Sequence, residues 1–395
     1  MESPFDLAQI HYQQGVALYE SRRYAEALTS FIKAGEADAD HLDAHWNECI
    51  TRLMLGDFKE GWPLHEARWQ KNEGRWEPDP AKRGLRHIPH PLWIGEHSVG
   101  EKSVVGKTVC LWAEQGFGDT LQFCRYAPMV QALGAKIFLY VREPIARLLA
   151  QSFAGTGIDV VGGNQPLPPF DVHCPMMSLS LACGTDSVDK IPAHTPYIFA
   201  KDEDVLHWKN RLASHTQQGF EGNETSKRVG LVWSGLMRST NPAAAKMDAE
   251  RSIDFELLAP LLSQTQQGLQ GIQWFSLQKD SDLPFESGVI DFTADLHDWA
   301  DTAALVANLD LVISCDTAVA HLAASMGKPT WILSRHIGCW RWLDHRTDSP
   351  WYPSVRLFHQ SAPGDWAGVV GEVMGVLGST SSDKRIATDF LSLDA

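Results

Sequence analysis

The residues best suited to chemistry lie in one run, LVISCDTAVAHLAASMG, at positions 311–327. An apolar stretch of strand length reaches Asp316 and passes at once into a helix-compatible segment of small residues. A strand, a polar turn and a helix start are the parts from which α/β proteins build anion sites at the carboxyl ends of strands. The run therefore predicts a diphosphate site, although an ordinary capped helix after a core strand explains it equally well.

The residues after Asp316 each have a place in this predicted site. Thr317 is the expected N-cap of the helix. The small side chains that follow would leave the backbone N–H groups open to a ligand at Ala318, Val319 and Ala320. His321 would lie on the first helical turn, where the helix dipole disfavours an imidazolium. A neutral imidazole beside open amides suits diphosphate binding better than acid–base work.

A second glycine-rich loop, EQGFGDT at positions 114–120, follows another apolar run and precedes a predicted helix over 121–133. Gly116 and Gly118 permit a tight turn and a close approach of a ligand to the backbone. Asp119 would lie at the junction of loop and helix, where an N-cap and a catalytic carboxylate are equally plausible. The loop is not a dinucleotide fingerprint, because the third glycine and the later acidic residue are missing.

Two successive parts of the chain alternate apolar runs with helical patterns, which favours parallel, doubly wound sheets. In the first part, strands are expected at 109–113, 136–141, 158–162 and 171–174. In the second part, they are expected at 228–233, 272–277, 289–292, 309–314, 329–333 and 355–358. A last helix is expected at 366–377.

The bulk composition permits this architecture and argues against a duplex nucleic-acid binder, while leaving a small anionic ligand possible. The chain has 395 residues, enough for two or three domains that each have a hydrophobic core. Its net charge is −15, whereas a protein that binds duplex nucleic acid is expected to have a basic face. Its seven cysteines form no CxxC pair, so we expect reduced thiols in a cytoplasmic protein. The sequence shows no signal peptide and no transmembrane run.

The first 75 residues follow a different rule, since similar residues recur 34 positions apart. The matched pairs are Gly15 and Cys49, Tyr24 and Phe58, Ala27 and Gly61, and Phe31 and His65. This period is that of tetratricopeptide repeats, and it predicts helix pairs at 9–21 with 24–37 and at 42–55 with 58–70. Two repeats fall short of a free-standing array, so the segment is expected to pack on the α/β body or on another chain. Its role is either packing or docking of a partner.

These patterns divide the chain into six parts. The predicted boundaries are 1–75 for the repeats, 76–106 for a linker, 107–200 for a first Rossmann-like domain, 201–227 for a second linker, 228–377 for a second Rossmann-like domain and 378–395 for a loose tail. Tryptophans 69, 76 and 93 are expected to be buried plugs at a domain seam. Trp340, Trp342 and Trp351 are expected to pack between the domains, where Arg341 could reach the cleft.

From about residue 8 to 360, the chain resembles bacterial repeat-containing glycosyltransferases related to the ADP-heptose:lipopolysaccharide heptosyltransferases and, more distantly, to the O-linked N-acetylglucosamine transferases. The motifs that carry this resemblance are LGDFKEGW at 55–62, Arg68-Trp69, AEQGFGDT at 113–120, Trp233-Ser234-Gly235, Arg251-Ser-Ile, Ser276-Leu-Gln278 and DTAVAH at 316–321. It implies the GT-B fold, in which two Rossmann-like domains face each other across a cleft and the second holds a nucleotide-sugar.

The resemblance also implies roles for single residues. Asp119 would be the base that deprotonates an acceptor hydroxyl, beside a loop formed with Gln115, Gly116 and Gly118. The turn at 316–321 would hold the diphosphate of the donor, and Ser234 and Gly235 would form another donor-facing loop. Gln278 would contact the nucleoside. Arg251 falls where relatives use a phosphate-binding lysine, and Lys246 is near enough to serve instead, so that assignment stays open.

The expected activity is therefore transfer of a sugar from a nucleotide-sugar to a hydroxyl of a protein or glycan acceptor, inverting and metal-independent. No cofactor is expected, and His336 and His345 match no tetrahedral zinc pattern. The alternatives are a non-catalytic repeat scaffold with a vestigial nucleotide-sugar pocket and, more weakly, a nucleotide-sugar epimerase. The repeats could dock the acceptor, or bury their open end against a second copy of the chain. The identities of the sugar and nucleotide stay open.

Overall fold

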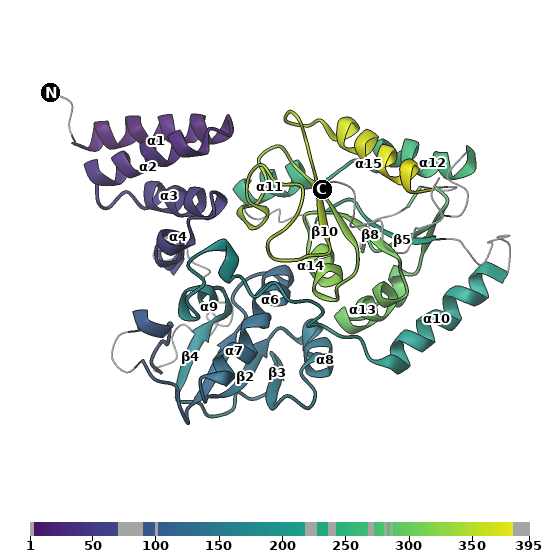
Figure 1. Ribbon diagram of the computed structural model, residues 1–395, viewed down its shortest axis with the longest axis horizontal. Helices are drawn as coiled ribbons and strands as arrows, with labels where there is room; N and C mark the ends of the chain where they lie inside the picture. The colour runs from purple at the N-terminus through teal and green to yellow at the C-terminus, as the bar shows by residue number, and fades with distance from the viewer. Residues whose placement is uncertain are drawn as a thin grey trace.

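Two separate parallel sheets and an N-terminal helical segment build this mixed α/β chain (Figure 1). The structure, a computed structural model, describes residues 4–69, 90–98, 102–217, 227–235, 242–267, 272–279, 283–284 and 287–381. Trp76 and most of the predicted linkers at 76–106 and 201–227 fall outside these residues, as does the tail after 381. The domain boundaries accordingly stay predictions.

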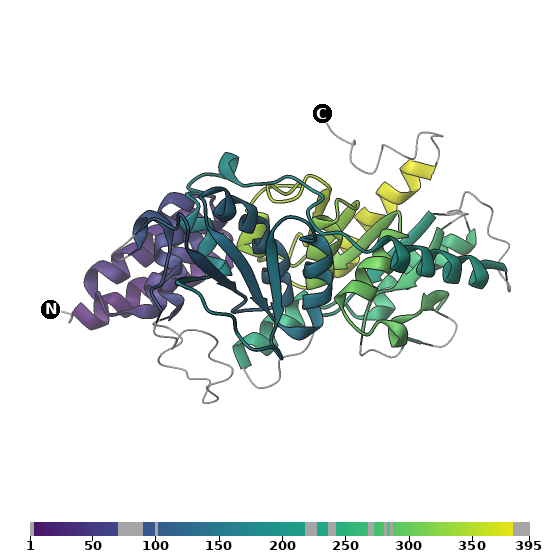
Figure 2. The same cartoon turned by 90° about the horizontal axis from the view of Figure 1, so that it is seen from below.

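The helical segment occupies one end of an elongated molecule, as Figures 1 and 2 both show. It comprises α1 (Pro4–Glu20), α2 (Tyr24–Ala37), α3 (Leu42–Met54) and α4 (Phe58–His65). Helix α1 begins five residues before its predicted start, and α4 ends five residues before its predicted end. Small residues let these helices approach, because a Cβ on Gly15 would lie 2.5 Å from Phe31 and one on Gly61 would lie 2.7 Å from Leu53. The two helix pairs are as expected, and their assignment as tetratricopeptide repeats stays a prediction.

The first sheet has four parallel strands in the order β3-β2-β1-β4. Its strands are β1 (Thr108–Trp112), β2 (Lys136–Val141), β3 (Ile158–Gly162) and β4 (Val172–Pro175), and its helices are α6 (Phe117–Phe123), α7 (Ala127–Ala132), α8 (Glu143–Ser152) and α9 (Leu179–Ala182). The single helix predicted over 121–133 is wrong in detail. It begins four residues earlier, and a 3-10 turn, η3 (Cys124–Tyr126), separates α6 from α7. Pro128, the second residue of α7, has no N–H to donate back to Cys124, so α-helical hydrogen bonding does not continue through this turn.

The second sheet has six parallel strands in the order β10-β9-β8-β5-β6-β7. Its strands are β5 (Lys227–Val232), β6 (Ile272–Ser276), β7 (Val289–Asp291), β8 (Leu311–Cys315), β9 (Thr330–Ser334) and β10 (Val355–His359). The helices of this half are α10 (Asp202–Gln217), α11 (Pro242–Arg251), α12 (Ala259–Gln267), α13 (Trp299–Ala307), α14 (Ala318–Ser325) and α15 (Trp366–Ser381). All ten predicted strands are present, and α15 runs four residues beyond its predicted end.

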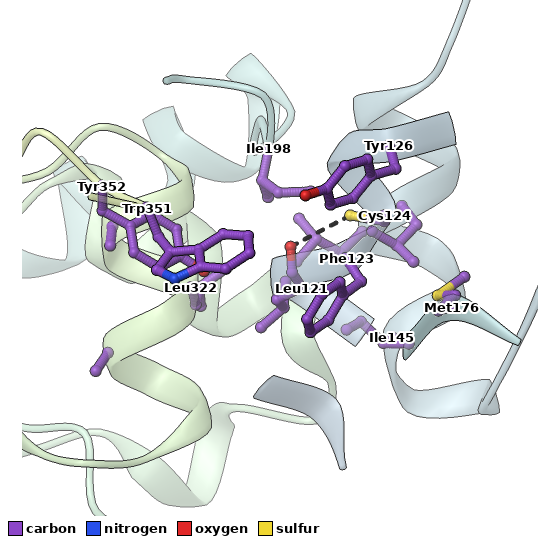
Figure 3. Close-up of a cluster of buried hydrophobic side chains, with 14 of the residues drawn as sticks. Leu121, Phe123, Cys124, Tyr126, Ile145, Met176, Ile198, Leu322, Trp351 and Tyr352 are labelled. Carbon is purple, nitrogen blue, oxygen red and sulfur yellow. Dashed lines mark hydrogen bonds between the residues drawn. The ribbon is translucent and has the colours of Figure 1, made fainter. Parts of the chain in front are cut away.

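A continuous apolar core joins the helical segment to both sheets. Figure 3 shows its centre, where Leu121 and Phe123 of α6 face Leu322 of α14 together with Trp351 and Tyr352. Trp340, Trp342 and Trp351 are buried at this seam, as predicted. Trp93 is likewise buried, whereas Trp69 is half-buried and lies 5.8 Å from Trp112 between ring centroids.

Two expectations from the sequence concern the cysteines, expected to be reduced thiols, and transmembrane helices, of which none was expected. All seven cysteines are free thiols, and five of them are buried. Within the described parts of the chain, none of the helices combines the length and the apolar character needed to cross a bilayer.

Candidate functional site

The strand orders place a topological switch point in each sheet. In the first sheet, β2 and β4 lie on opposite sides of β1, and in the second, β6 and β8 lie on opposite sides of β5. Open α/β sheets bind ligands outside the carboxyl ends of the strands at such points. The loop after β1 carries Asp119, and the turn after β8 carries Asp316, so both predicted loops flank a switch point.

These two loops touch each other. A Cβ built on Gly118 would lie 2.9 Å from Cδ2 of His321 and 3.4 Å from Cα of Ala318. Only a glycine fits at this distance, so the first turns of α6 and α14 meet directly. The loop after β1 and the turn after β8 therefore pack against each other.

Asp119 lies within the first turn of α6 rather than at the junction predicted from the sequence. Gly116 takes the N-cap position, and Asp119 Oδ2 accepts a hydrogen bond of 2.9 Å from its N–H. Asp119 Oδ1 forms an ion pair with Arg341 Nη2, and its side chain is 20% exposed. Asp119 is thus a helix-capping residue, and in this state both of its oxygens are occupied.

Arg341 completes the site from the other half of the chain. It lies in a 3-10 turn, η8 (Trp340–Trp342), after β9, and its guanidinium carbon is 4.3 Å from the centre of the Trp340 ring. Its Nε donates to Gln122 Oε1 at 2.8 Å, and its Nη1 donates to Cys339 Sγ at 3.3 Å. The sequence suggested that Arg341 could reach the cleft but not that it would pair with Asp119. The only local signal is a cation between two tryptophans.

The turn at the end of β8 has the predicted form. Thr317 occupies the N-cap position of α14, but its Oγ1 lies 2.9 Å from Ser314 Oγ and makes no cap bond to the helix. The backbone N–H groups of Ala318, Val319 and Ala320 are in the first helical turn, which has no intrahelical acceptors for them. Asp316 precedes them, and burial raises the pKa of its carboxyl, an effect that Arg251 and Arg341 partly offset.

His321 is neutral, as predicted, although the main cause differs from the one expected. Burial lowers the pKa of its imidazole well below the usual value, and the charges of Arg341 and Arg125 lower it further. Its ring stacks on Trp342 with 5.2 Å between centroids, and its Nδ1 lies 2.9 Å from the hydroxyl of Tyr352. These contacts place the imidazole in the wall of the seam, directly against Gly118.

The structure separates the two cations that compete for the phosphate role. Arg251 Nη1 donates to the carbonyl of Asp316 at 3.1 Å, and its Nη2 binds Asp248 Oδ1 at 2.7 Å. Its guanidinium also lies against Gly235, where a Cβ would be 2.6 Å from Nε. Lys246 is 74% exposed and lies 3.7 Å from Glu250. Arg251, not Lys246, therefore belongs to the turn after β8.

Ser234 and Gly235 follow β5 and lie beside Arg251 at the switch point. Gln278 holds this loop, because its Oε1 accepts the N–H of Ser234 at 2.8 Å and that of Trp233 at 3.3 Å. Its Nε2 donates to the Lys279 carbonyl at 3.3 Å, and the side chain is buried. In this state Gln278 positions the Ser234 loop, and its Nε2 uses one of its two N–H groups in the bond to Lys279.

The loop after β1 is anchored by a buried ion pair that links it to the helical segment. Arg68 donates to both oxygens of Glu114 at 2.9 Å, and the two side chains are 3% and 5% exposed. Arg68 also donates to Ser178, which follows β4, at 2.7 Å. The motif residues Arg68 and Glu114 thus have a structural role that the sequence did not indicate. Gln115, next in the chain, is half-buried.

Over the residues for which positions are described, no three His, Cys, Asp or Glu side chains gather in an arrangement that could hold a metal ion. His336 contacts the carbonyl of Gln360, and His345 pairs with Asp344.

Comparison with known proteins finds one family model that matches a short part of the chain. Residues 298–334 match the model of glycosyltransferase family 9 (heptosyltransferase). The match runs from the N-cap of α13 to the end of β9, so it contains the turn at 316–321 but neither Asp119 nor Arg341.

One curated relative and two solved structures are similar over longer spans. Protein FlbA of Caulobacter vibrioides is 28% identical over 402 residues, which cover 91% of this chain and 61% of that protein. The chain therefore spans about three fifths of the length of this relative.

A family 9 glycosyl transferase from Veillonella parvula has a TM-score of 0.45 at 12% identity, covering 73% of this chain and 92% of its own. The dodecameric iron-containing glycosyltransferase TibC from enterotoxigenic E. coli has a TM-score of 0.43 at 13% identity, covering 68% of this chain and 66% of its own.

Proposed function

We propose that this protein is a glycosyltransferase that moves a sugar from a nucleotide-sugar to an acceptor hydroxyl. The observation that carries the proposal is the contact between the first turns of α6 and α14, which brings Asp119 to the amide-lined turn at 317–320. The match of residues 298–334 to the model of glycosyltransferase family 9 supports the same chemistry. A GT-B arrangement of the two sheets is part of the proposal.

The diphosphate of the donor would bind where positive character converges. The first-turn amides of α14 and the positive end of its dipole favour an anion. Arg251 donates a hydrogen bond to the carbonyl of Asp316, one residue before Thr317, and Arg341 forms an ion pair with Asp119. Preorganised donors of this kind stabilise the negative charge that develops on a departing diphosphate.

Asp119 would serve as the base after an exchange of partners. A bound diphosphate would attract Arg341, which in the unliganded state pairs with Asp119. The freed carboxylate would take the proton of the acceptor hydroxyl as its oxygen bonds to the anomeric carbon and the bond from that carbon to the diphosphate breaks. One base and one displacement make the reaction inverting. Arg251 and Arg341 supply positive charge, so we propose a metal-independent reaction.

The acceptor remains a wider proposal. The acceptor would be a protein or a glycan that docks along α1 to α4 and presents a hydroxyl group. The position of this helical segment against the first sheet is consistent with such docking. We also propose that the open end of that segment pairs with a second copy of the chain. A cytoplasmic location is a further proposal.

The decisive experiment is incubation of the full chain with UDP-, ADP- and GDP-sugars, with and without candidate acceptors, read by release of nucleoside diphosphate. Acceptor-dependent release supports transfer. Nucleotides that raise the melting temperature without any release would instead favour the non-catalytic scaffold. Conversion of a donor sugar with no acceptor present would favour an epimerase.

A further inference from the structure

The loop after β9 packs against the helical segment on both sides of Arg341. Before this residue, the Trp340 ring meets the Trp62 ring of α4 edge to face, with 5.4 Å between ring centroids. After it, Asp344 Oδ1 accepts a hydrogen bond of 2.7 Å from Nη2 of Arg22, which lies in the turn between α1 and α2. Arg341 is therefore carried by a turn that the helical segment holds at each end.

The ion pair between Arg22 and Asp344 is shielded from solvent. The two side chains are 23% and 10% exposed, so solvent and salt screen their attraction little. The other carboxylate oxygen of Asp344 lies 2.9 Å from Nε2 of His345, so both oxygens have partners. Loss of Arg22 would leave this carboxylate without its permanent cation, which is costly at a site of this kind.

Unfavourable backbone conformations are concentrated at the same contact. Among the described residues other than glycine, positive φ angles occur at Arg22 (58°), Leu343 (57°) and His345 (55°). A left-handed backbone is unfavourable for such residues and persists where the surrounding contacts hold it. Leu343 directly follows the 3-10 turn that carries Arg341. The conformation of this turn thus depends on its contacts with the helical segment more than on local preference.

Arg341 reaches across the seam from this turn and makes several directional contacts. Its Nε donates to Gln122 Oε1 at 2.8 Å, and its Nη2 pairs with Asp119. The fork of a guanidinium binds with a fixed geometry, so these contacts are sensitive to the position of the backbone that carries it. A shift of the turn would change where the guanidinium lies relative to the first-turn amides of α14, and with it the proposed contact to a diphosphate.

We propose that Arg22 is a positioning residue for Arg341 and acts on it through Asp344. The inference rests on the proposed function, because it gives the turn between α1 and α2 a part in donor binding. The helical segment would then belong to the donor site and would not serve only to dock an acceptor. Arg22 itself would touch neither donor nor acceptor.

The test measures two properties of the full chain. Titration calorimetry gives the dissociation constants of UDP, ADP, GDP and CDP. Hydrogen exchange read by mass spectrometry gives the protection of the backbone amides over 340–345. Within this stretch, the N–H of Trp342 donates to the Cys339 carbonyl at 3.0 Å, and that of Leu343 donates to the Trp340 carbonyl at 3.2 Å. Their exchange reports whether the turn is held, whatever the protein binds.

Three variants separate positioning from general stability. Arg22→Gly removes the cation and suits the positive φ at this position. Arg22→Lys keeps the positive charge and tests rescue. Arg23→Met is the matched control, because Arg23 is the next residue and its pair with Glu26 is more than half exposed on both sides.

We expect Arg22→Gly to weaken nucleoside diphosphate binding about tenfold, the effect of weakening one hydrogen bond to a charged group, and to speed exchange over 340–345 about tenfold. Arg22→Lys should stay within about threefold of the unsubstituted chain, and Arg23→Met within about twofold. Added to Arg341→Met, Arg22→Gly should change the affinity less than about twofold, because two residues that act through one contact are not additive.

Unchanged exchange or unchanged affinity in Arg22→Gly overturns the inference. An equal loss of affinity when Arg22→Gly is added to Arg341→Met overturns it too, as does a loss as large in Arg22→Lys as in Arg22→Gly. Faster exchange in Arg22→Gly, when the unsubstituted chain binds none of these nucleotides, supports the hold of Arg22 on the turn and overturns the proposed function instead. If Arg22→Gly fails to fold by its melting curve, Asp344→Asn, which removes the carboxylate charge, replaces it with the same expected outcomes.

Discussion

Arg341 and Asp119 form an ion pair across the seam, although they are 222 positions apart in the chain. Arg341 belongs to the turn after β9 of the second sheet, and Asp119 belongs to the helix after β1 of the first sheet. The pair places a cation and a carboxylate beside the first-turn amides of α14. This relationship makes the proposed exchange of partners on diphosphate binding testable.

Replacement of Asp119 by asparagine tests its role as base. The amide oxygen can still accept the N–H of Gly116, so the helix start is retained, but the side chain can no longer take a proton. We expect turnover to fall by about 10²- to 10⁴-fold, the usual contribution of a general base. Nucleoside diphosphate release under saturating donor measures it, with the exposed Asp159→Asn as control. Full turnover in Asp119→Asn would remove this residue from the mechanism.

The two candidate phosphate cations should differ in their effect on affinity. Arg251→Lys loses the bridge between the Asp316 carbonyl and Asp248, whereas Lys246→Met alters an exposed side chain. We expect nucleoside diphosphate affinity to fall about tenfold in the first and less than twofold in the second, because a lysine cannot reproduce the fork of a guanidinium. Titration calorimetry measures both, and the reverse order would reassign the phosphate contact to Lys246.

The contact at Gly118 should tolerate no side chain. An added Cβ would lie 2.9 Å from His321, so Gly118→Ala must push α6 and α14 apart and is expected to cost about 1–3 kcal/mol of unfolding free energy. Gly371→Ala on α15 is the matched control, since nothing lies within 4 Å of its added Cβ. Alanine there should be neutral or stabilise the helix by about 0.5–1 kcal/mol. Equal stability of the two variants, measured by urea denaturation, would contradict the close contact.

The buried pair between Arg68 and Glu114 should control attachment of the helical segment. Arg68→Met leaves the Glu114 carboxylate buried without its cation, and such a change typically costs about 3–5 kcal/mol. Arg23→Met removes the pair with Glu26, in which both side chains are more than half exposed, and should leave the stability nearly unchanged. Denaturation followed by tryptophan fluorescence compares the two. A small effect at Arg68 would show that the repeats do not depend on this contact.

Stability should fall as the pH is lowered from about 6.5 to 5. Burial lowers the pKa of His321 and of His65 well below the usual value, with arginine charges adding to the effect in each case. Both therefore bind a proton in the unfolded chain before they do so in the folded one, and each removes up to about 1.4 kcal/mol of stability per pH unit below the unfolded pKa. His321→Phe should reduce the dependence of the unfolding free energy on pH by the contribution of one histidine, and His194→Gln at an exposed position should not. An unchanged slope in His321→Phe would contradict a neutral buried imidazole.

Much of the site could be predicted from local sequence because its parts are local. The strand, turn and helix of 311–327 and the loop at 114–120 each lie within one short segment, and their patterns indicated both the elements and the open amides. The neutrality of His321 was also predicted, but from the helix dipole, whereas its burial under Trp342 and Tyr352 is the larger cause. A local pattern does not show which distant side chains will cover a residue.

The amino-acid sequence by itself determined the ten strands, the helical hairpins at the start and the two polar turns, because hydrophobic period and glycine placement act over a few neighbouring residues. Only the tertiary structure decided the order of the strands, the contact of Arg251 with the turn after β8, the use of Gln278 to hold the Ser234 loop and the pairing of Arg341 with Asp119. Each of these depends on which surfaces pack together, and packing joins residues through space without regard to their separation along the chain.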